Sequence, residues 1–216
     1  MIININKPAG ITSHDVVDVV RRITGERRVG HAGTLDPFAT GVLIVGVTRE
    51  GTKQLGEISK NTEKEYRATL CLGKMSSTGD LTGEIREGGD PSSLTRKQIE
   101  NVLSTFRGES EQVPPAFSAI KINGTPAYKL ARKGQRVELQ PRKIFIHTLE
   151  LVDFESPYLT ITVTCSSGTY IRTLAEDIGK KLNVGAYLTE LTRTRVGTFQ
   201  LAESISLSDL HQEKGL

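Results

Sequence analysis

The segment GHAGTLDPFATG, from Gly30 to Gly41, places the strongest constraint on how this chain can fold. It holds glycines, a proline and one carboxylate, Asp36, and the apolar run VLIVGV follows at Val42 to Val47. Glycine permits positive φ, and Pro37 disfavours helical backbone at Asp36. A continuous apolar run of this length is typical of a strand buried on both faces. We therefore predict a tight loop beside a buried strand, and we call Gly30–Gly41 the signature segment.

The residues alone leave two interpretations of Asp36. An aspartate before a proline often closes a turn through its own side chain. A carboxylate held in a rigid loop could also be presented for chemistry, but the residues alone favour the turn. The nearest acids in sequence are Glu26 and Glu50, outside the segment. A local carboxylate pair of the glycosidase kind is therefore not indicated, although a distant acid could fold in.

Composition predicts an ordinary soluble globular protein. The 216 residues fit one large domain or two small ones, with 37% hydrophobic and 25% charged residues. No apolar run approaches the roughly 20 residues that cross a bilayer, and no signal segment opens the chain, so we expect a cytoplasmic protein. Neither the two cysteines, Cys71 and Cys165, nor the four histidines show metal-ligand spacing. We therefore expect no metal.

Charge is unevenly distributed, although the net charge is only +3. Four arginines and one acid, Glu26, lie between Arg21 and His31. Seven basic residues and one acid, Glu138, lie between Lys121 and Lys143, whereas acids collect between Asp80 and Glu111. This segregation indicates a face that binds a polyanion. Solvated faces of surface helices would explain it equally well.

Periodicity and capping signals predict the secondary structure of the first half. We expect a strand over 1–6, a helix starting at Thr12 or Ser13 and ending at Gly25, a half-buried strand over 64–73, a loop over 74–83, and a helix after the capping box Thr95-x-x-Gln98. The segment 46–53 resembles a phosphate-binding P-loop in its glycine spacing. Thr52 precedes Lys53, however, and this order excludes a nucleoside triphosphate site.

The second half is predicted to contain a small lobe and two more sheet strands. We expect the lobe at about 109–150, a hairpin turn at Asn123-Gly124, a basic helix over 127–133, paired strands over 142–154 and 159–166, a helix after Gly168-Thr169-Tyr170, and a final turn over 207–210. Arg172 falls near the start of its helix, where a cation is unfavourable to the helix dipole unless it has a partner.

Several motifs together resemble one enzyme family. The signature segment is similar to the catalytic motif of the tRNA pseudouridine-55 synthases of the B type, the TruB family. Further family-like pieces follow in the same order: NKPAGITSHDVV (6–17), KEYRATLCLG (64–73), VPPAFSAIKINGTPAYKLAR (113–132), SSGTYIRTLAEDIG (166–179) and GAYLTELTRTRVGTF (185–199). The resemblance covers nearly the whole chain. The stretch 74–83 departs from the family pattern, since it has Ser76 and Ser77 where threonine and aspartate are usual.

The resemblance implies roles for individual residues. Asp36 would be the essential catalytic residue, Arg172 its ion-pair partner, and Tyr66 the aromatic residue against the target base. Tyr170 and Leu191 would line the uridine pocket, and His31 would support the flipped nucleotide. We also expect Lys7 and Pro8 near the site, and we expect RNA-backbone contacts from Arg27, Arg28, Lys121, Lys129 and Arg132.

The resemblance also implies the fold, the substrate and the absence of cofactors. We predict an α+β pseudouridine synthase fold, with a mixed, mostly antiparallel sheet flanked by helices, a central cleft and a small inserted lobe that clasps RNA. The whole of 1–216 would be one catalytic domain, without the extra C-terminal RNA-binding domain of many family members. The expected partner is the T-arm stem-loop of tRNA, and we expect a monomer without an obligatory protein partner.

Two alternative functions remain open from sequence. A related branch of the family modifies ribosomal RNA under the direction of a guide RNA and needs partner proteins. An RNA-binding or RNA-folding module would keep the fold and dispense with chemistry. Activity on bare tRNA separates the first alternative, and replacement of Asp36 separates the second.

Overall fold

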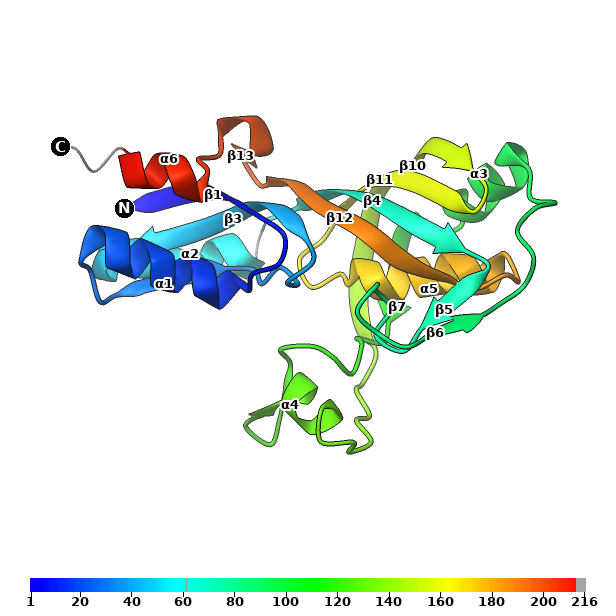
Figure 1. Ribbon diagram of the computed structural model, residues 1–216, viewed down its shortest axis with the longest axis horizontal. Helices are drawn as coiled ribbons and strands as arrows, with labels where there is room; N and C mark the ends of the chain where they lie inside the picture. The colour runs from blue at the N-terminus through cyan, green and yellow to red at the C-terminus, as the bar shows by residue number, and fades with distance from the viewer. Residues whose placement is uncertain (61, 213–216) are drawn as a thin grey trace. The chain divides into compact units, whose positions relative to one another are not determined.

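The computed structural model describes residues 1–60 and 62–212 (Figure 1). These residues form two compact units. Unit 1 comprises Met1–Arg67, Thr164–Ser167 and Glu190 onward, and unit 2 comprises Ala68–Val163 and Gly168–Thr189. The hydrogen-bonded order of strands is β1-β3-β12-β4-β11-β10-β7, with β2 beside β3 and β13 beside β12. Strands β4 (Lys64–Leu72), β11 (Tyr158–Cys165) and β12 (Ala186–Val196) contribute residues to both units.

Unit 1 is built on β3 (Thr40–Val47), which is buried along almost its whole length. Strands β1 (Ile2–Lys7) and β2 (Val29–Ala32) pair with it antiparallel, and β12 pairs with it in parallel at Thr192 and Arg193. Unit 1 also contains α2 (Thr48–Lys60), β13 (Phe199–Gln200), a short 3-10 helix (Leu201–Glu203) and α6 (Leu207–Gln212). The prediction of a strand buried on both faces at 42–47 is confirmed.

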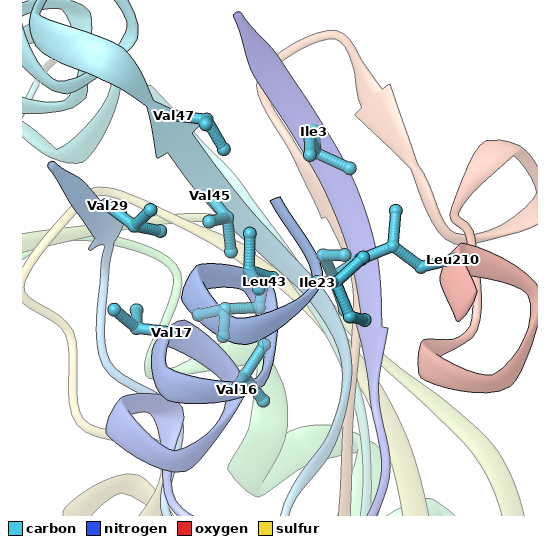
Figure 2. Packing of buried hydrophobic residues seen from close by; sticks show 11 residues of the cluster. Ile3, Val16, Val17, Ile23, Val29, Leu43, Val45, Val47 and Leu210 are labelled. Carbon is cyan, nitrogen blue, oxygen red and sulfur yellow. The ribbon is translucent and has the colours of Figure 1, made fainter. Parts of the chain in front are cut away.

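Helix α1 (Ser13–Thr24) forms where the sequence predicts it. Thr12 caps its first turn in a reciprocal capping box with Asp15, and Gly25 ends it in the left-handed conformation. Val16, Val17 and Ile23 lie on one face and pack against Leu43 and Val45 of β3 and Leu210 of α6 (Figure 2). Each buried aliphatic side chain of this kind contributes about 1.5–3 kcal/mol.

Unit 2 contains the strands and helices that follow. Its elements are β5 (Lys74–Ser76), β6 (Ile85–Glu87), α3 (Arg96–Ser104), β7 (Gly108–Gln112), β8 (Lys121–Ile122), β9 (Thr125–Pro126), α4 (Ala127–Ala131), β10 (Arg142–Glu155) and α5 (Ile171–Lys181). The capping box at Thr95 and the hairpin turn at Asn123-Gly124 are confirmed. The ends of the predicted lobe are the paired strands β7 and β10.

Three local predictions were wrong. The signature segment is not a loop throughout, because Gly30–Ala32 belong to β2 and Thr40 and Gly41 belong to β3. The predicted loop at 74–83 begins with β5, which forms a hairpin with β6. The predicted basic helix over 127–133 ends at Ala131. In the first two cases the strand pairs with residues outside the segment for which a loop was predicted. A mixed, mostly antiparallel sheet flanked by helices is confirmed.

Within 1–60 and 62–212, the structure contains no helix with the length and apolar character needed to cross a membrane.

Gly41 makes a testable contribution to unit 1. Its φ is +100°, and a Cβ there would overlap the backbone carbonyl of Arg193. Gly41→Ala should therefore lower the free energy of unfolding by about 3 kcal/mol, from left-handed strain plus overpacking. Urea unfolding followed by circular dichroism measures this. Gly25→Ala is the matched control, because φ is +69° and nothing lies within 4 Å of its Cβ position; it should cost about 1 kcal/mol. Equal losses would contradict the overlap.

Candidate active site

The irregular part of the signature segment is the short stretch from Gly33 to Ala39, between β2 and β3. Leu35 and Ala39 are buried and anchor it, whereas Asp36 is half-buried between them. The backbone carbonyl of Asp36 accepts a hydrogen bond from the N–H of Ala39 at 3.1 Å, which closes a tight turn. The bond that closes this turn therefore uses the backbone of Asp36 and not its carboxylate.

Lys7 stabilises this stretch by hydrogen bonds to backbone carbonyls. Its side chain has no exposed surface, and its Nζ donates to the carbonyls of Pro8, Ile11 and Pro37 at 2.8, 2.7 and 3.2 Å. Burial lowers the pKa of Lys7 to about 8, although the Asp36 carboxylate opposes this shift. Lys7 therefore joins the turn after β1 to the turn at Pro37. Its predicted substrate contact stays a prediction.

Ser13 holds the same stretch from α1. Its Oγ accepts from the N–H of Leu35 at 2.9 Å and donates to the carbonyl of Leu35 at 3.1 Å. One buried hydroxyl thus satisfies both backbone groups of the residue before Asp36. The start of α1 is thereby coupled to the position of the carboxylate.

Arg193 on β12 binds backbone carbonyls on both sides of Asp36 in the sequence. It is 1% exposed, and it donates from Nε to the carbonyl of Val42 at 2.8 Å and from Nη2 to the carbonyl of Gly33 at 2.9 Å. Thr40 and Thr192 add a hydroxyl contact at 2.9 Å beside it. These bonds fix both ends of the stretch that carries Asp36.

Tyr66 lies on the part of β4 that belongs to unit 1 and is 7% exposed. Desolvation raises the pKa of its phenol, and the Arg193 guanidinium opposes that shift. The Asp36 carboxylate also acts on this pKa, and it raises it. The two predicted catalytic residues of unit 1 therefore share one electrostatic environment.

His31 on β2 lies in the same environment. Burial and the positive charge of Arg193 lower the pKa of its imidazole, so the neutral form is favoured. Among the residues that the structure describes, its Nδ1 is buried without a hydrogen-bond partner. A neutral imidazole with an unused ring nitrogen is compatible with a role in supporting a nucleotide, which stays a prediction.

In unit 2, Arg172 is a buried cation with several partners. It is 4% exposed, in contrast to most arginines in the first turn of a helix. It donates from Nη1 to the carbonyl of Thr78 at 3.0 Å and from Nη2 to the carbonyl of Phe117 at 2.8 Å, and its Nε lies 3.8 Å from Oδ2 of Asp80. The two carbonyl oxygens and the Asp80 carboxylate offset the unfavourable interaction between the Arg172 charge and the helix dipole. Its predicted pairing with Asp36 stays a prediction.

The departure at Ser76 is accommodated around Asp80. The Oδ1 of Asp80 accepts from the hydroxyls of Thr78 and Thr82 at 2.7 and 2.5 Å. Ser76 donates its hydroxyl to the backbone carbonyl of Asp80 at 2.5 Å. Serine therefore takes part in the network that holds the partner of Arg172.

Tyr170 is fixed by two residues that face each other across β7 and β10. Gln112 donates from Nε2 to the carbonyl of Tyr170 at 3.0 Å and accepts from its N–H at 2.8 Å. Arg142 lies over the Tyr170 ring at 5.8 Å from its centroid. Gln112 and Arg142 are opposite one another in the strand register. The start of α5 is therefore anchored to the sheet.

The remaining predicted residues differ in exposure, and their roles stay predictions. Leu191 is buried, and Pro8 is exposed. The predicted RNA-backbone residues are all exposed: Arg27, Arg28, Lys121, Lys129 and Arg132. In the described part of the chain, no group of three or more His, Cys, Asp or Glu side chains is placed to hold a metal ion.

Sequence reasoning missed Ser13, Gln112 and Arg193. A signal existed for Arg193, because LTRTRV alternates like a strand and places Arg193 in phase with the buried Leu191. An arginine on the buried face of a strand needs partners. No such signal marked Ser13 or Gln112, whose partners are backbone groups far away in sequence.

Two family models match consecutive parts of this chain. The first describes the N-terminal domain of TruB family pseudouridylate synthases and matches residues 21–171. The second describes the C-terminal domain of tRNA pseudouridylate synthase B and matches residues 172–215. The chain belongs to the TruB family.

Curated relatives from this family match over nearly the whole chain. A tRNA pseudouridine synthase B from Mycobacterium sp. (strain KMS) is 49% identical over 219 residues, which cover 100% of this chain and 73% of the relative. The Geobacter sulfurreducens protein of the same name is 48% identical, with 96% and 68% covered. The Clostridium tetani protein is 44% identical, with 98% and 73% covered.

Two solved structures of lower sequence identity have the same fold. A Cbf5-Nop10-Gar1 complex matches with a TM-score of 0.77 and 32% identity. An H/ACA RNP bound to a substrate RNA containing 2'-deoxyuridine matches with a TM-score of 0.73 and 30% identity. Each match covers 100% of this chain but only 56% and 55% of the respective solved chain. The predicted pseudouridine synthase fold is confirmed.

Ser13 offers a test of the support beneath the TruB signature segment. Ser13→Ala should lower the free energy of unfolding by about 1–3 kcal/mol, because the buried N–H of Leu35 loses its acceptor. Hydrogen exchange at the Leu35 amide should accelerate in parallel. Ser104→Ala serves as control, since its hydroxyl makes only an exposed bond to the carbonyl of Asn101, and it should stay within about 0.5 kcal/mol. Unchanged exchange at Leu35 would contradict the assignment.

Proposed function

We propose that this chain converts uridine to pseudouridine in tRNA, at position 55 of the T-loop, with Asp36 as the catalytic residue. The observation that carries the proposal is the 49% identity with a tRNA pseudouridine synthase B over the whole chain. The half-buried position of Asp36 supports it, on a stretch whose backbone is held by Lys7, Ser13 and Arg193. The proposed partner is tRNA, and the proposed state is a cytoplasmic monomer without an obligatory protein partner.

The reaction needs few groups, and this chain supplies candidates for them. The N1–C1′ bond breaks, the uracil turns, and a C5–C1′ bond forms, after which the proton on C5 moves to N1. The carboxylate of Asp36 is the candidate for the step at the glycosidic bond. The Tyr66 phenol is the candidate for stacking on the base and for contact with the C5 proton. Leu191 and Tyr170 are the proposed lining of the pocket.

Substrate access follows from the chemistry. A uridine stacked in a T-loop has to leave the stack, which costs a few kcal/mol. Phosphate contacts from exposed basic residues and stacking on aromatic side chains offset this cost. Arg27, Arg28, Lys121, Lys129 and Arg132 are all exposed and available for such contacts. The overall shape of the stem-loop, more than base edges, is the proposed basis of recognition.

A guide-RNA-directed enzyme is the second candidate, because an H/ACA RNP is among the solved structures that match. Its 30% identity is lower than the 44–49% of the tRNA enzymes. Modification of bare tRNA transcript without guide RNA or added protein would support the first candidate. A requirement for a guide would support the second.

Replacing Asp36 tests the proposed chemistry. With a T-arm hairpin that carries 5-tritiated uridine, the wild type should release tritium, and Asp36→Asn should release it at least about 100-fold more slowly. Binding of the hairpin should persist, because the amide keeps the shape of the carboxylate. Asp153→Asn is the control, since Asp153 is exposed and caps only the N–H of Phe154. Wild-type activity in Asp36→Asn would refute the proposed role.

Salt dependence tests the proposed RNA face. Lys129→Ala and Arg132→Ala should each reduce the slope of log affinity against log salt by roughly 0.7 to 0.9, because each removes one phosphate contact. Filter binding of the T-arm hairpin at several salt concentrations gives the slope. Arg96→Ala on α3 is the matched control, since Arg96 is an exposed cation beside Glu100. An unchanged slope would remove the substituted residue from the interface.

A further inference from the structure

Gln112 is a buried polar residue to which none of the predicted roles applies. It is the last residue of β7, and it is 3% exposed, whereas residues 109–111 of the same strand are exposed. Burying an amide costs free energy unless its donor and its acceptor both find partners. A methionine would fill a similar volume without needing partners. The glutamine at this position therefore requires a reason beyond packing.

The partners of Gln112 are the two backbone groups of a single residue. Its Nε2 donates to the carbonyl of Tyr170 at 3.0 Å, and its Oε1 accepts from the N–H of Tyr170 at 2.8 Å. One bond would leave the Tyr170 backbone free to rotate about it, whereas two bonds restrict both position and orientation. The same carbonyl also accepts from the N–H of Leu174 at 3.1 Å, in the first turn of α5.

Tyr170 occupies the N-cap position of α5. Serine, threonine, aspartate and asparagine are preferred there, because their side chains accept from the first N–H groups of the helix. In the described structure, the Tyr170 side chain makes no such capping bond. The residue is half-buried, so part of its surface stays open to contact. A tyrosine at this position therefore favours a role for the ring, while Gln112 supplies the support of the backbone.

The ring of Tyr170 is held by the residue opposite Gln112. Arg142, the first residue of β10, pairs with Gln112 in the strand register, and its guanidinium lies over the Tyr170 ring at 5.8 Å from the centroid. All three residues belong to unit 2. One pair of facing strand residues thus contacts both the backbone and the ring of Tyr170.

We propose that Gln112 is a positioning residue, whose side-chain amide fixes the Tyr170 backbone so that the ring keeps one placement against the bound uridine. The catalytic consequence rests on the proposed function, in which Tyr170 lines the uridine pocket. A misplacement of about 1 Å near reacting groups can cost about 100-fold in rate. Gln112 acts through Tyr170, without itself contacting the uridine.

A purely structural role for Gln112 predicts a different result. If the amide only stabilised the start of α5, its loss would slow the reaction to the same extent whether or not the Tyr170 ring is present. A residue that acts through the ring has no further effect once the ring is removed. A double-mutant cycle separates these possibilities.

The experiment compares wild type, Gln112→Met, Tyr170→Ala and the double variant. Tritium release is measured in a single turnover with saturating T-arm hairpin, and hairpin affinity is measured separately. Gln112→Met should slow release about 10- to 100-fold, with affinity within about twofold of wild type. In the Tyr170→Ala background the same substitution should change the rate by less than about twofold.

Gln98→Met is the matched control. Gln98 also lies at the start of a helix of unit 2, and its Oε1 accepts from the N–H of Thr95 at 2.8 Å. Its loss removes a structural glutamine-to-backbone bond at α3. Gln98→Met should therefore leave the rate of tritium release in the folded enzyme within about twofold of wild type.

NMR tests the positioning of the ring without activity. The ring resonances of Tyr170 should shift in Gln112→Met and stay unchanged in Gln98→Met, and exchange of the Tyr170 amide should accelerate only in Gln112→Met. Should Gln112→Met fail to fold, Gln112→Asn takes its place in both measurements. It keeps an amide at the position but is one methylene too short to hold both backbone groups of Tyr170.

The outcomes are distinct. An equal loss of rate in the wild-type and Tyr170→Ala backgrounds, or unmoved Tyr170 ring resonances in the Gln112 variant, would each overturn the proposal. A wild type that releases no tritium would instead refute the proposed function, and the ring resonances would still decide whether Gln112 positions Tyr170.

Discussion

The structure of unit 1 depends on pairing buried cations with backbone carbonyls. A stretch as irregular as Gly33–Ala39 cannot satisfy its own carbonyls as a helix or a sheet would, and buried carbonyls without donors are costly. Lys7 and Arg193 supply those donors from two different strands. The Asp36 carboxylate lies on the same stretch, and its charge opposes the lowering of the Lys7 pKa that burial causes. A cation that helps the loop to fold is therefore also an electrostatic neighbour of Asp36.

Unit 2 also contains a buried cation, but a carboxylate is among the groups that hold it. Arg172 occupies the first turn of a helix, where its charge opposes the dipole, and it is retained by two carbonyls and by Asp80. Asp80 is in turn held by threonine hydroxyls, and Tyr170 by the amide of Gln112. Unit 1 thus carries Asp36 on an irregular stretch whose carbonyls are bound by two cations. Unit 2 carries Arg172 on a helix, where two carbonyls and one carboxylate hold it.

The sequence predicted the elements whose signals are local. The capping box of α1, its apolar face and the stop at Gly25 are all contained within one short stretch, as are the hairpin at Asn123-Gly124 and the alternation of β4. Helix α2 was missed, because its residues were read only against a phosphate-binding motif. Asp36 and Tyr66 became candidates for the site because the family-like motifs contain them, and their roles stay predictions. Ser13 and Gln112 were not predicted, because their partners are backbone atoms that only the tertiary fold brings near. Arg193 was missed although the alternation of its strand places it on the buried face.

The two cysteines give the architecture a practical consequence. Cys165 belongs to unit 1 and Cys71 to unit 2, and both are buried thiols outside any disulfide. A small alkylating reagent can reach such a thiol only when the surrounding strand opens. The rate at which each cysteine is modified under native conditions therefore reports the opening free energy of its own half of the molecule. Comparing the two modification rates shows whether the two units open together or separately.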